Sequence, residues 1–240
     1  RYRKSYSIFL KMFNKIFCVS DNDYHQIKMN ISNDEIYKIG NPRYDRILNN
    51  LENVEYKLDS SRQDEGSILI FASMWDEDNK IIFEKFINSP LVNHFKKVII
   101  VPHEVNDSYL NYYCSVLEDN DFSFKKINQY QNFNQFEEKY IIVNKVGFLS
   151  KLYAQSTITY VGGGFSKSGI HNIIEPAAAS NPVIFGSNFL NSNKSDAEGL
   201  IDVSGGFSVD SYELFTEKIN WLLDKNNYNN SSKNCKSFVT

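Results

Sequence analysis

The chain has 240 residues, of which 42% are hydrophobic and 15% aromatic, enough for one large or two small packed domains. The formal net charge of −3 gives no global basic field, so nucleic-acid binding is not expected. Cys18, Cys114 and Cys235 are far apart and form no CxxC pair, which argues against a disulfide framework or a zinc site. No apolar run reaches the ~18–20 residues that span a bilayer. Residue 1 is arginine and no signal peptide is present, so we expect a fragment of a longer protein.

The first fifty residues predict the end of an α/β sheet. A basic amphipathic start predicts a helix with a solvated charged face, and a short strand, a helix capped by Ser20 or Asp21, a strand and a helix follow. The corresponding ranges are 1–14, 15–20, 22–29, 35–39 and 43–51. The polar, turn-rich residues 52–66 predict a linker.

A second alternation of strands and helices begins after this linker. The apolar and β-branched runs predict strands at 67–72, 97–101, 122–126, 140–143, 157–161, 183–185 and 206–208. Helices are expected at 78–88, 107–118, 147–155, 171–179, around 195–201 and at 210–223, the last with Asp210 as N-cap, and 226–240 reads as a polar helix or frayed end. Short connections between alternating elements predict a doubly wound, mostly parallel sheet.

Residues 157–186 form the most informative stretch, a strand, a glycine loop, a helix and a strand. Such a unit can place backbone N–H groups and the positive end of a helix beside an anion. Gly162, Gly163 and Gly164 do not match G-x-G-x-x-G or a P-loop, so a plain tight turn remains an alternative. His171 and Glu175 are four residues apart, on one face of the expected helix, and this polar cluster favours a binding site.

Polar, glycine or aromatic residues follow five of the predicted strands, where ligands of such sheets bind. They are Ser73 to Asp78, Pro102 to Glu104, Asn144 to Gly147, the glycine loop with His171, Asn172 and Glu175, and Gly186 to Asn188. These ends should lie on one edge of the sheet, which suits a nucleotide-sized ligand. Trp75 could instead be a packing residue and His103 an ordinary loop histidine.

The same loops resemble the 3-deoxy-D-manno-octulosonic acid (Kdo) transferases of lipopolysaccharide synthesis, a GT-B glycosyltransferase family. The motifs that carry the resemblance are A-S-M-W-D-E-D at 72–78, V-P-H-E at 101–104, G-F-L-S-K-L-Y at 147–153, Y-V-G-G-G-F at 160–165, G-I-H-N-I-I-E at 169–175 and P-V-I-F-G at 182–186. Upstream, G-N-P-R-Y-D-R at 40–46 is similar to the family's pattern near the interdomain linker. The resemblance covers nearly the whole chain in order.

Some positions depart from the family. Many members have Pro-Arg-His where this chain has Pro102, His103 and Glu104, so one arginine that faces phosphate is missing there. Met74 replaces a usual threonine, and the loop 166–168 has an extra residue. By resemblance, residues 1–60 are the end of the N-terminal acceptor-side domain with the linker. Residues 61–240 are then the Rossmann-like, C-terminal donor-binding domain, truncated at its C-terminus.

The resemblance implies an inverting transfer of Kdo from CMP-Kdo to a lipid A precursor, lipid IVA, without a cofactor or bound metal. The general base would lie in the missing N-terminal domain, so no catalytic residue is predicted in this chain and the fragment alone should be inactive. The parent protein would act at the cytoplasmic face of the bacterial inner membrane, while this chain by itself should be soluble. The residues expected to bind the donor are Ser73, Trp75, Pro102, His103, Glu104, Gly147, Leu149, Gly163, Gly164, Gly169, His171, Asn172 and Glu175.

Within this set the resemblance implies distinct roles. Ser73, Pro102, His103 and Gly147 would frame the cytidine and phosphate, and Glu175 would accept hydrogen bonds from the ribose hydroxyls. The phosphate would lie near helix N-termini that open at Gly147 and at 169–171. Asn172 would support the loop or contact the phosphate. Alternatively, Glu175 only offsets a helix dipole.

Two other functions remain open from the sequence. One is a different GT-B enzyme that uses a UDP-sugar, such as an N-acetylglucosaminyltransferase or a 2-epimerase. The other is a non-catalytic α/β binding domain. A dehydrogenase is disfavoured, because the dinucleotide fingerprint and its later acidic residue are not in place.

Overall fold

The computed structural model describes residues 8–31, 35–52, 67–129, 131–147, 149–189 and 193–240. Its internal contacts divide the chain into two compact units, Arg1–Arg46 and Ile47–Thr240, which we call unit 1 and unit 2. The predicted linker at 53–66 lies outside the described residues, so the predicted domain boundary at residue 60 stays a prediction. Within the described part of the chain, no helix is both long enough and apolar enough to cross a bilayer.

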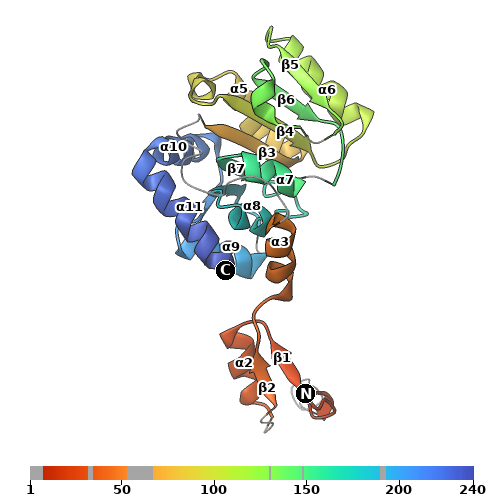
Figure 1. Cartoon of the computed structure of the whole chain (residues 1–240), viewed down its shortest axis with the longest axis vertical. Helices are drawn as coiled ribbons and strands as arrows, with labels where there is room; N and C mark the ends of the chain where they lie inside the picture. The colour runs from red at the N-terminus through yellow and green to blue at the C-terminus, as the bar shows by residue number, and fades with distance from the viewer. Residues whose placement is uncertain (1–7, 32–34, 53–66, 130, 148, 190–192) are drawn as a thin grey trace. The chain divides into compact units, whose positions relative to one another are not determined.

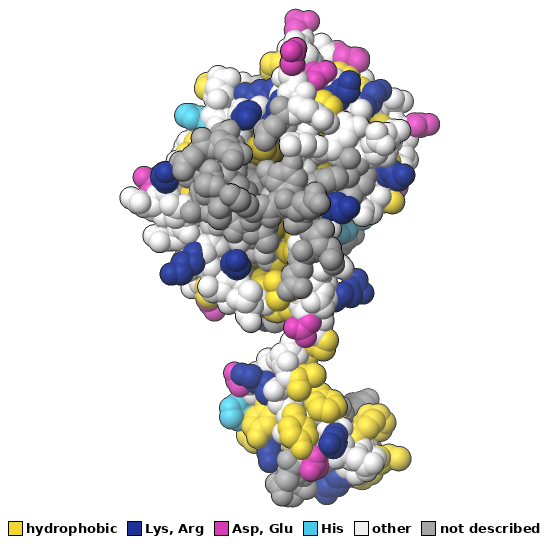
Figure 2. Space-filling view, in the orientation of Figure 1, with side chains coloured by type: hydrophobic (Ala, Val, Ile, Leu, Met, Phe, Trp, Pro, Cys, Tyr) yellow, Lys and Arg dark blue, Asp and Glu magenta, His cyan; other side chains and the backbone are white. Residues whose placement is uncertain are grey.

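Unit 1 contains the predicted strand–helix–strand unit. Strands β1 (Ile16–Cys18) and β2 (Ile36–Lys38) pair in parallel, and α2 (Asp21–Lys28) connects them. Of the predicted helix 1–14, residues 8–10 are helical, 11–14 are not, and 1–7 lie outside the described residues. Hydrophobic side chains gather on the surface of this unit, as Figure 2 shows.

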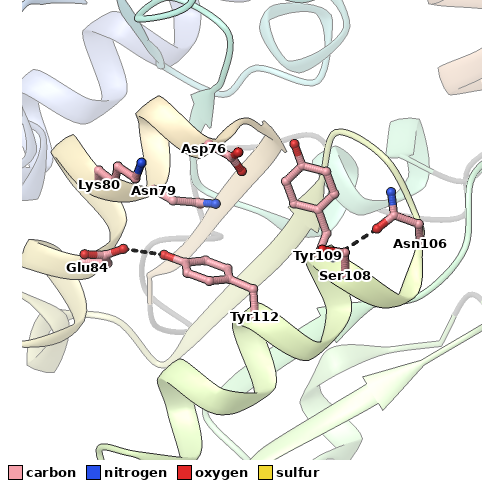
Figure 3. A pocket seen from close by; sticks show the side chains of 8 residues that line it. All are labelled: Asp76, Asn79, Lys80, Glu84, Asn106, Ser108, Tyr109 and Tyr112. Carbon is pink, nitrogen blue, oxygen red and sulfur yellow. Dashed lines mark hydrogen bonds between the residues drawn. The ribbon is translucent and has the colours of Figure 1, made fainter.

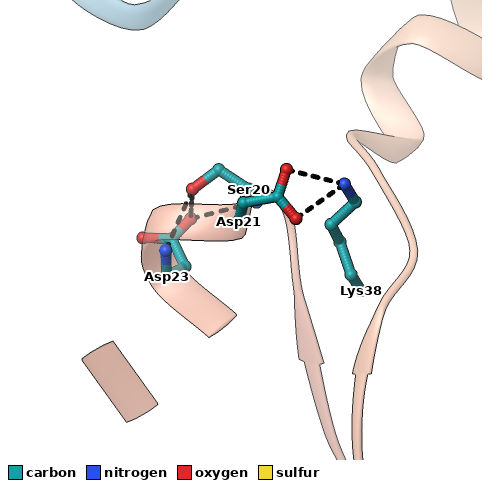
Figure 4. A network of polar contacts seen from close by, with 4 residues as sticks. All are labelled: Ser20, Asp21, Asp23 and Lys38. Atoms are coloured by element: carbon teal, nitrogen blue, oxygen red, sulfur yellow. Dashed lines mark hydrogen bonds and ion pairs between the residues drawn. The ribbon is translucent and has the colours of Figure 1, made fainter. Parts of the chain in front are cut away.

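The polar contacts of unit 1 explain where α2 begins. Ser20 is the N-cap: its hydroxyl accepts from the Asp23 N–H at 3.1 Å, and the Asp23 carboxylate accepts from the Ser20 N–H at 3.2 Å. This reciprocal capping box satisfies two backbone donors that a helix start would otherwise leave open. Asp21, the other predicted cap, instead pairs with Lys38 of β2 at 2.8 Å (Figure 4).

Unit 2 is built on a seven-stranded, wholly parallel sheet in the order β5-β6-β4-β3-β7-β8-β9 (Figure 1). The strands are β3 (Ile68–Met74), β4 (Lys97–Pro102), β5 (Phe124–Ile127), β6 (Tyr140–Val143), β7 (Ile158–Val161), β8 (Val183–Gly186) and β9 (Gly206–Val209). From β3 the chain runs to β4, then to β5 at the edge and back to β6 between β5 and β4, and it then crosses to add β7, β8 and β9 on the other side of β3. The order therefore reverses between β3 and β7, which is the topological switch point where ligands of doubly wound sheets bind.

Helices connect these strands, and α3 (Pro42–Glu52) precedes them. They are α4 (Asp76–Asp78), the π-helical turn η2 (Asn79–Phe83), α5 (Glu84–Ile87), the 3₁₀ turns η3 (Pro90–His94) and η4 (Phe133–Gln135), α6 (Asp107–Glu118), α7 (Leu149–Gln155), α8 (Ile174–Ala178), α9 (Lys194–Asp202), α10 (Tyr212–Leu223) and α11 (Lys225–Val239). The predicted alternation of strands and helices is thereby confirmed.

Both faces of the large sheet are buried. Phe71 of β3 packs against Phe83, Phe86 and Phe215, with ring centroids 5.2–6.2 Å apart, so η2, α5 and α10 cover one face. Ile70 points to the opposite face and is also fully buried. Strands that are covered on both faces have continuous apolar sequences, so their positions could be predicted from the sequence.

Two predicted helix starts are wrong. The helix expected at 171–179 begins at Ile174, because Pro176 has no N–H and would interrupt the interior of a helix that began at His171. From Ile174, the proline falls in the first turn, where no N–H is needed. The N-cap of α10 is Ser211, not Asp210, and its hydroxyl accepts from the Leu214 N–H at 3.3 Å.

Candidate functional site

The site lies where β3 and β7 end, at the switch point of the sheet. Strand β3 extends two residues beyond its predicted end, with a register irregularity between Ala72 and Met74 opposite β4. Ser73 sits in this bulge with a φ of 55°, a left-handed conformation that few residues other than glycine adopt. The bulge turns the chain so that Trp75 directly follows the strand. The His103 N–H then donates to the Met74 carbonyl at 3.0 Å, which ties the β4 loop to this edge.

The glycine loop packs closely against neighbouring backbone. A Cβ at Gly162 would lie 2.3 Å from the Ser73 carbonyl oxygen, and a Cβ at Gly164 would lie 2.5 Å from the Gly186 Cα. Such distances are far inside van der Waals contact, so any side chain there would force the backbone to move. These two glycines let the loop lie between the ends of β3 and β8. Gly163 and Gly169, both predicted donor-binding residues, have positive φ values of 94° and 78°.

Asp78 holds the glycine loop in place through a hydrogen bond from the Gly163 N–H. Its fully buried carboxylate accepts three hydrogen bonds, from the Tyr160 hydroxyl at 2.6 Å, the Gly163 N–H at 2.8 Å and the Trp75 N–H at 3.1 Å. Burial raises the pKa of the Asp78 carboxyl, although these three hydrogen bonds act in the opposite direction. Asp78 is among the polar residues that follow the first predicted strand of unit 2, but it is not in the predicted donor-binding set.

Three rings, from Trp75, His103 and His171, meet above the loop. The Trp75 and His103 rings are stacked, with centroids 4.0 Å apart at 19°, and the His103 and His171 centroids are 4.5 Å apart. The Trp75 indole N–H donates to His171 Nε2 at 2.9 Å, so that nitrogen carries no proton. Burial lowers the pKa of both imidazoles, and the proximity of His103 lowers that of His171 further. The cluster therefore presents neutral imidazoles at neutral pH.

Asn172 and Glu175 form a second polar group on the loop before α8. The Asn172 side chain donates to Glu175 Oε1 at 2.7 Å and accepts from the Ile174 N–H at 3.1 Å. His171 and Asn172 precede the helix, so the predicted arrangement of His171 and Glu175 on one helix face is wrong. The predicted helix N-terminus at 169–171, with its dipole toward an anion, is absent for the same reason.

Two adjoining pockets bring many of the predicted residues together. One, of about 120 Å³, is lined by Ser73, Pro102, His103, Gly147 and Leu149, with Lys145 beside them. The other, of about 210 Å³, is lined by Gly147, Leu149 and Glu175 and also by Ser150 and residues of α3 from Ile47 onward. Gly147 and Leu149 line both, so the two pockets are adjacent, and we call the residues that line them the rim.

Several predicted donor-binding residues do not line these two pockets. Trp75 and His171 reach the rim through their ring contacts with His103. Gly163, Gly164 and Gly169 lie in the glycine loop and line neither pocket. Glu104 is exposed, does not line either pocket and accepts from the Asn106 side chain at 3.1 Å.

The predicted donor-binding set does not include Lys145 and Ser150, although residues 144–147 follow a predicted strand and 147–153 carry one of the motifs. Lys145 supplies a positive charge to the pocket that His103 also lines. Its place two residues after the predicted strand 140–143 is the signal that put it at the expected ligand edge, because strand ends of a parallel sheet share one edge.

Comparison with known proteins places this geometry in context. No family model matches the chain. It is 25% identical to a 3-deoxy-D-manno-octulosonic acid transferase of Rickettsia felis over 241 residues, covering 94% of this chain and 47% of that protein. It is 27% identical to a protein of the same name from Chlamydia trachomatis, covering 93% of this chain and 52% of that protein. The chain therefore spans about half the length of the curated relatives it matches.

Among solved structures, the C-terminal CMP-Kdo binding domain of WaaA from Acinetobacter baumannii has a similar fold. The TM-score is 0.60 at 14% identity, and the match covers 81% of this chain and 98% of that domain. The predicted resemblance to the Kdo transferases is thus confirmed, and the chain has the Rossmann-like α/β fold of the GT-B glycosyltransferases.

Proposed function

We propose that unit 2 binds the sugar nucleotide CMP-Kdo for a glycosyltransferase that transfers Kdo to a lipid A precursor. The observation that carries this proposal is the convergence of Ser73, His103 and Glu175 around adjoining pockets at the switch point of the sheet. The names of the relatives, and the CMP-Kdo binding domain with a similar fold, support the choice of donor.

The nucleotide would occupy the two adjacent pockets. Ser73, Pro102 and His103 line the smaller pocket and would frame the base and phosphate. Lys145 would offset the phosphate charge in place of the arginine that this chain lacks. The phosphate would also accept hydrogen bonds from backbone N–H groups near Gly147. Two helix N-termini are not required for this arrangement.

Glu175 would bind the ribose. Asn172 donates to Glu175 Oε1, which orients the carboxylate and leaves Oε2 to accept from a ribose hydroxyl. A carboxylate that accepts from a hydroxyl forms a charge-assisted hydrogen bond, stronger than a neutral one. Glu175 is the second residue of α8, where a carboxylate also offsets the helix dipole, and the hydrogen bond from Asn172 is the contact that favours the binding role.

The transfer itself would need groups outside this chain. We propose an inverting reaction, without a bound metal or cofactor, in which a carboxylate of another domain deprotonates the acceptor hydroxyl. The acceptor, lipid IVA, would be bound by that domain at the inner membrane. Accordingly, the 240-residue chain should bind the donor nucleotide without transferring Kdo.

The test is calorimetric titration of CMP and UMP into the chain, alongside Glu175→Gln. CMP should bind in preference to UMP, and the variant should weaken CMP binding by about 1.5–3 kcal/mol, the value of a hydrogen bond to a charged group. Glu213→Gln, at an exposed position on α10, is the matched control and should bind like the wild type. Preferential binding of UMP would favour a UDP-sugar enzyme instead. Kdo transfer by this chain alone would contradict the proposed missing base.

A further inference from the structure

A further cavity of unit 2 shares no lining residue with the two pockets of the proposed donor site. It measures about 460 Å³ and lies between the helical segment 76–87 and α6 (Figure 3). Asp76, Lys80 and Glu84 line one side, and Tyr109 and Tyr112 line the other. Small-molecule sites in proteins have volumes of about 300–1,000 Å³, so this cavity could hold a single sugar ring with room for its substituents.

A π-helical turn shapes the first wall. The Glu84 N–H donates to the Asn79 carbonyl, five residues back, where an α-helix would pair it four residues back. The additional residue in this turn places Asn79, Lys80 and Glu84 along the cavity. π-turns within α-helices are rare and occur frequently at functional sites, which is an indication independent of the cavity itself.

Fixed hydrogen bonds orient the polar groups of both walls. The Tyr113 hydroxyl donates to Asn79 Oδ1 at 2.8 Å, which leaves the Asn79 amide nitrogen directed into the cavity (Figure 3). The Tyr112 hydroxyl donates to Glu84 Oε1 at 2.7 Å. Burial and the Glu84 carboxylate raise the pKa of Tyr112, so it remains a donor at neutral pH. Oε2 of Glu84 remains able to accept from a ligand.

The charge of the cavity selects against anions. Asp76 and Glu84 bring two carboxylates against the single ammonium of Lys80. A phosphate or a carboxylate would meet net repulsion there. A ring rich in hydroxyls can donate to the carboxylates, accept from Asn79 and Lys80, and lay its C–H faces against the tyrosine rings. We propose that this cavity is a binding site for an uncharged sugar ring, and this inference does not rest on the assignment of the donor.

The experiment is a titration of the ¹⁵N-labelled 240-residue chain with methyl β-glucopyranoside, followed by amide chemical shifts. The shifts should move in 76–84 and 106–112 and remain unchanged in the glycine loop 162–169. Glucuronate, which has the same ring with a carboxylate, should give shifts at least tenfold smaller at equal concentration.

Variants separate binding from folding. Glu84→Gln should weaken the glucoside affinity about tenfold, as expected for the loss of one hydrogen bond to a charged group. Glu118→Gln, exposed at the far end of α6, should leave it unchanged. The amide spectrum of each variant outside the cavity reports whether it is folded. No shift with about 50 mM glucoside, shifts centred on the glycine loop, or an equal response to glucuronate would each overturn the proposal.

Discussion

Asp78 and Glu175 are two carboxylates beside the same glycine loop, and their surroundings differ sharply. Asp78 is fully buried and accepts from the Tyr160 hydroxyl and from the N–H groups of Gly163 and Trp75. Glu175 is partly exposed, accepts from Asn172 and borders an open pocket. We infer that one carboxylate builds the frame of the site and the other faces the ligand. This division of roles would be contradicted if an Asp78 variant kept its stability, or if a Glu175 variant lost stability but not ligand binding.

The largest effect is expected from Asp78→Ala. The change would leave three buried donors without an acceptor, and the free energy of unfolding should fall by about 3–5 kcal/mol. Urea unfolding measures this directly. Tyr160→Phe removes one of the three donors and should cost less, about 1 kcal/mol. A loss below about 1 kcal/mol for Asp78→Ala would mean that Asp78 does not hold the loop.

A smaller loss is expected from Gly164→Ala. The new Cβ would lie 2.5 Å from the Gly186 Cα, so the loop and the end of β8 would have to separate. Overpacking of this kind costs about 1–3 kcal/mol. Gly205→Ala should cost less in the same urea unfolding experiment, since the nearest atom there is the Cys235 sulfur at 2.9 Å and the nearest backbone atom, the Cys235 N, is 3.2 Å away. A Gly164→Ala variant as stable as the wild type would show that the loop is not tightly packed.

The smallest effect on the free energy of unfolding is expected from protonation of His171. Its folded-state pKa is lowered, so the folded protein binds this proton more weakly than the unfolded chain does. The contribution of His171 is therefore fully present above the ordinary pKa of about 6.5, and it is lost as pH falls through the lowered value. Because His171 is partly exposed, the loss should stay under about 1 kcal/mol.

Urea unfolding between about pH 7.5 and pH 5 tests this expectation, with His171→Phe as the comparison. The variant should lose part of the pH dependence, since it has no imidazole to protonate. An identical pH profile in wild type and variant would show that protonation of His171 is not linked to folding.

The fold was largely predictable because of particular apolar runs. Residues 68–72 and 97–101 are buried on both faces of a parallel sheet, and such strands are recognisable without knowledge of their neighbours. The register irregularity at Ser73 was not predictable, because it depends on how β3 meets β4. The start of α8 could have been predicted from Pro176, which is tolerated only in the first turn of a helix.

The candidate site was predictable in its members more than in its geometry. Strand ends indicated Ser73, His103 and Glu175, since parallel strands bring these ends to one edge. The role of Asp78 depends on Tyr160, 82 positions away, and on the adjacency of β3 and β7. No local pattern encodes such a contact. The stacking of Trp75 on His103 and its hydrogen bond to His171 required the same tertiary information.

The most direct test is to measure both CMP affinity and the free energy of unfolding for Glu175→Gln and Asp78→Asn. We predict that Glu175→Gln loses about 1.5–3 kcal/mol of CMP binding while its unfolding free energy stays within about 0.5 kcal/mol of the wild type. For Asp78→Asn, the main effect should be a lower free energy of unfolding. Unchanged CMP affinity in a destabilised Glu175→Gln variant would contradict the account, because Glu175 would then belong to the frame and not to the binding rim.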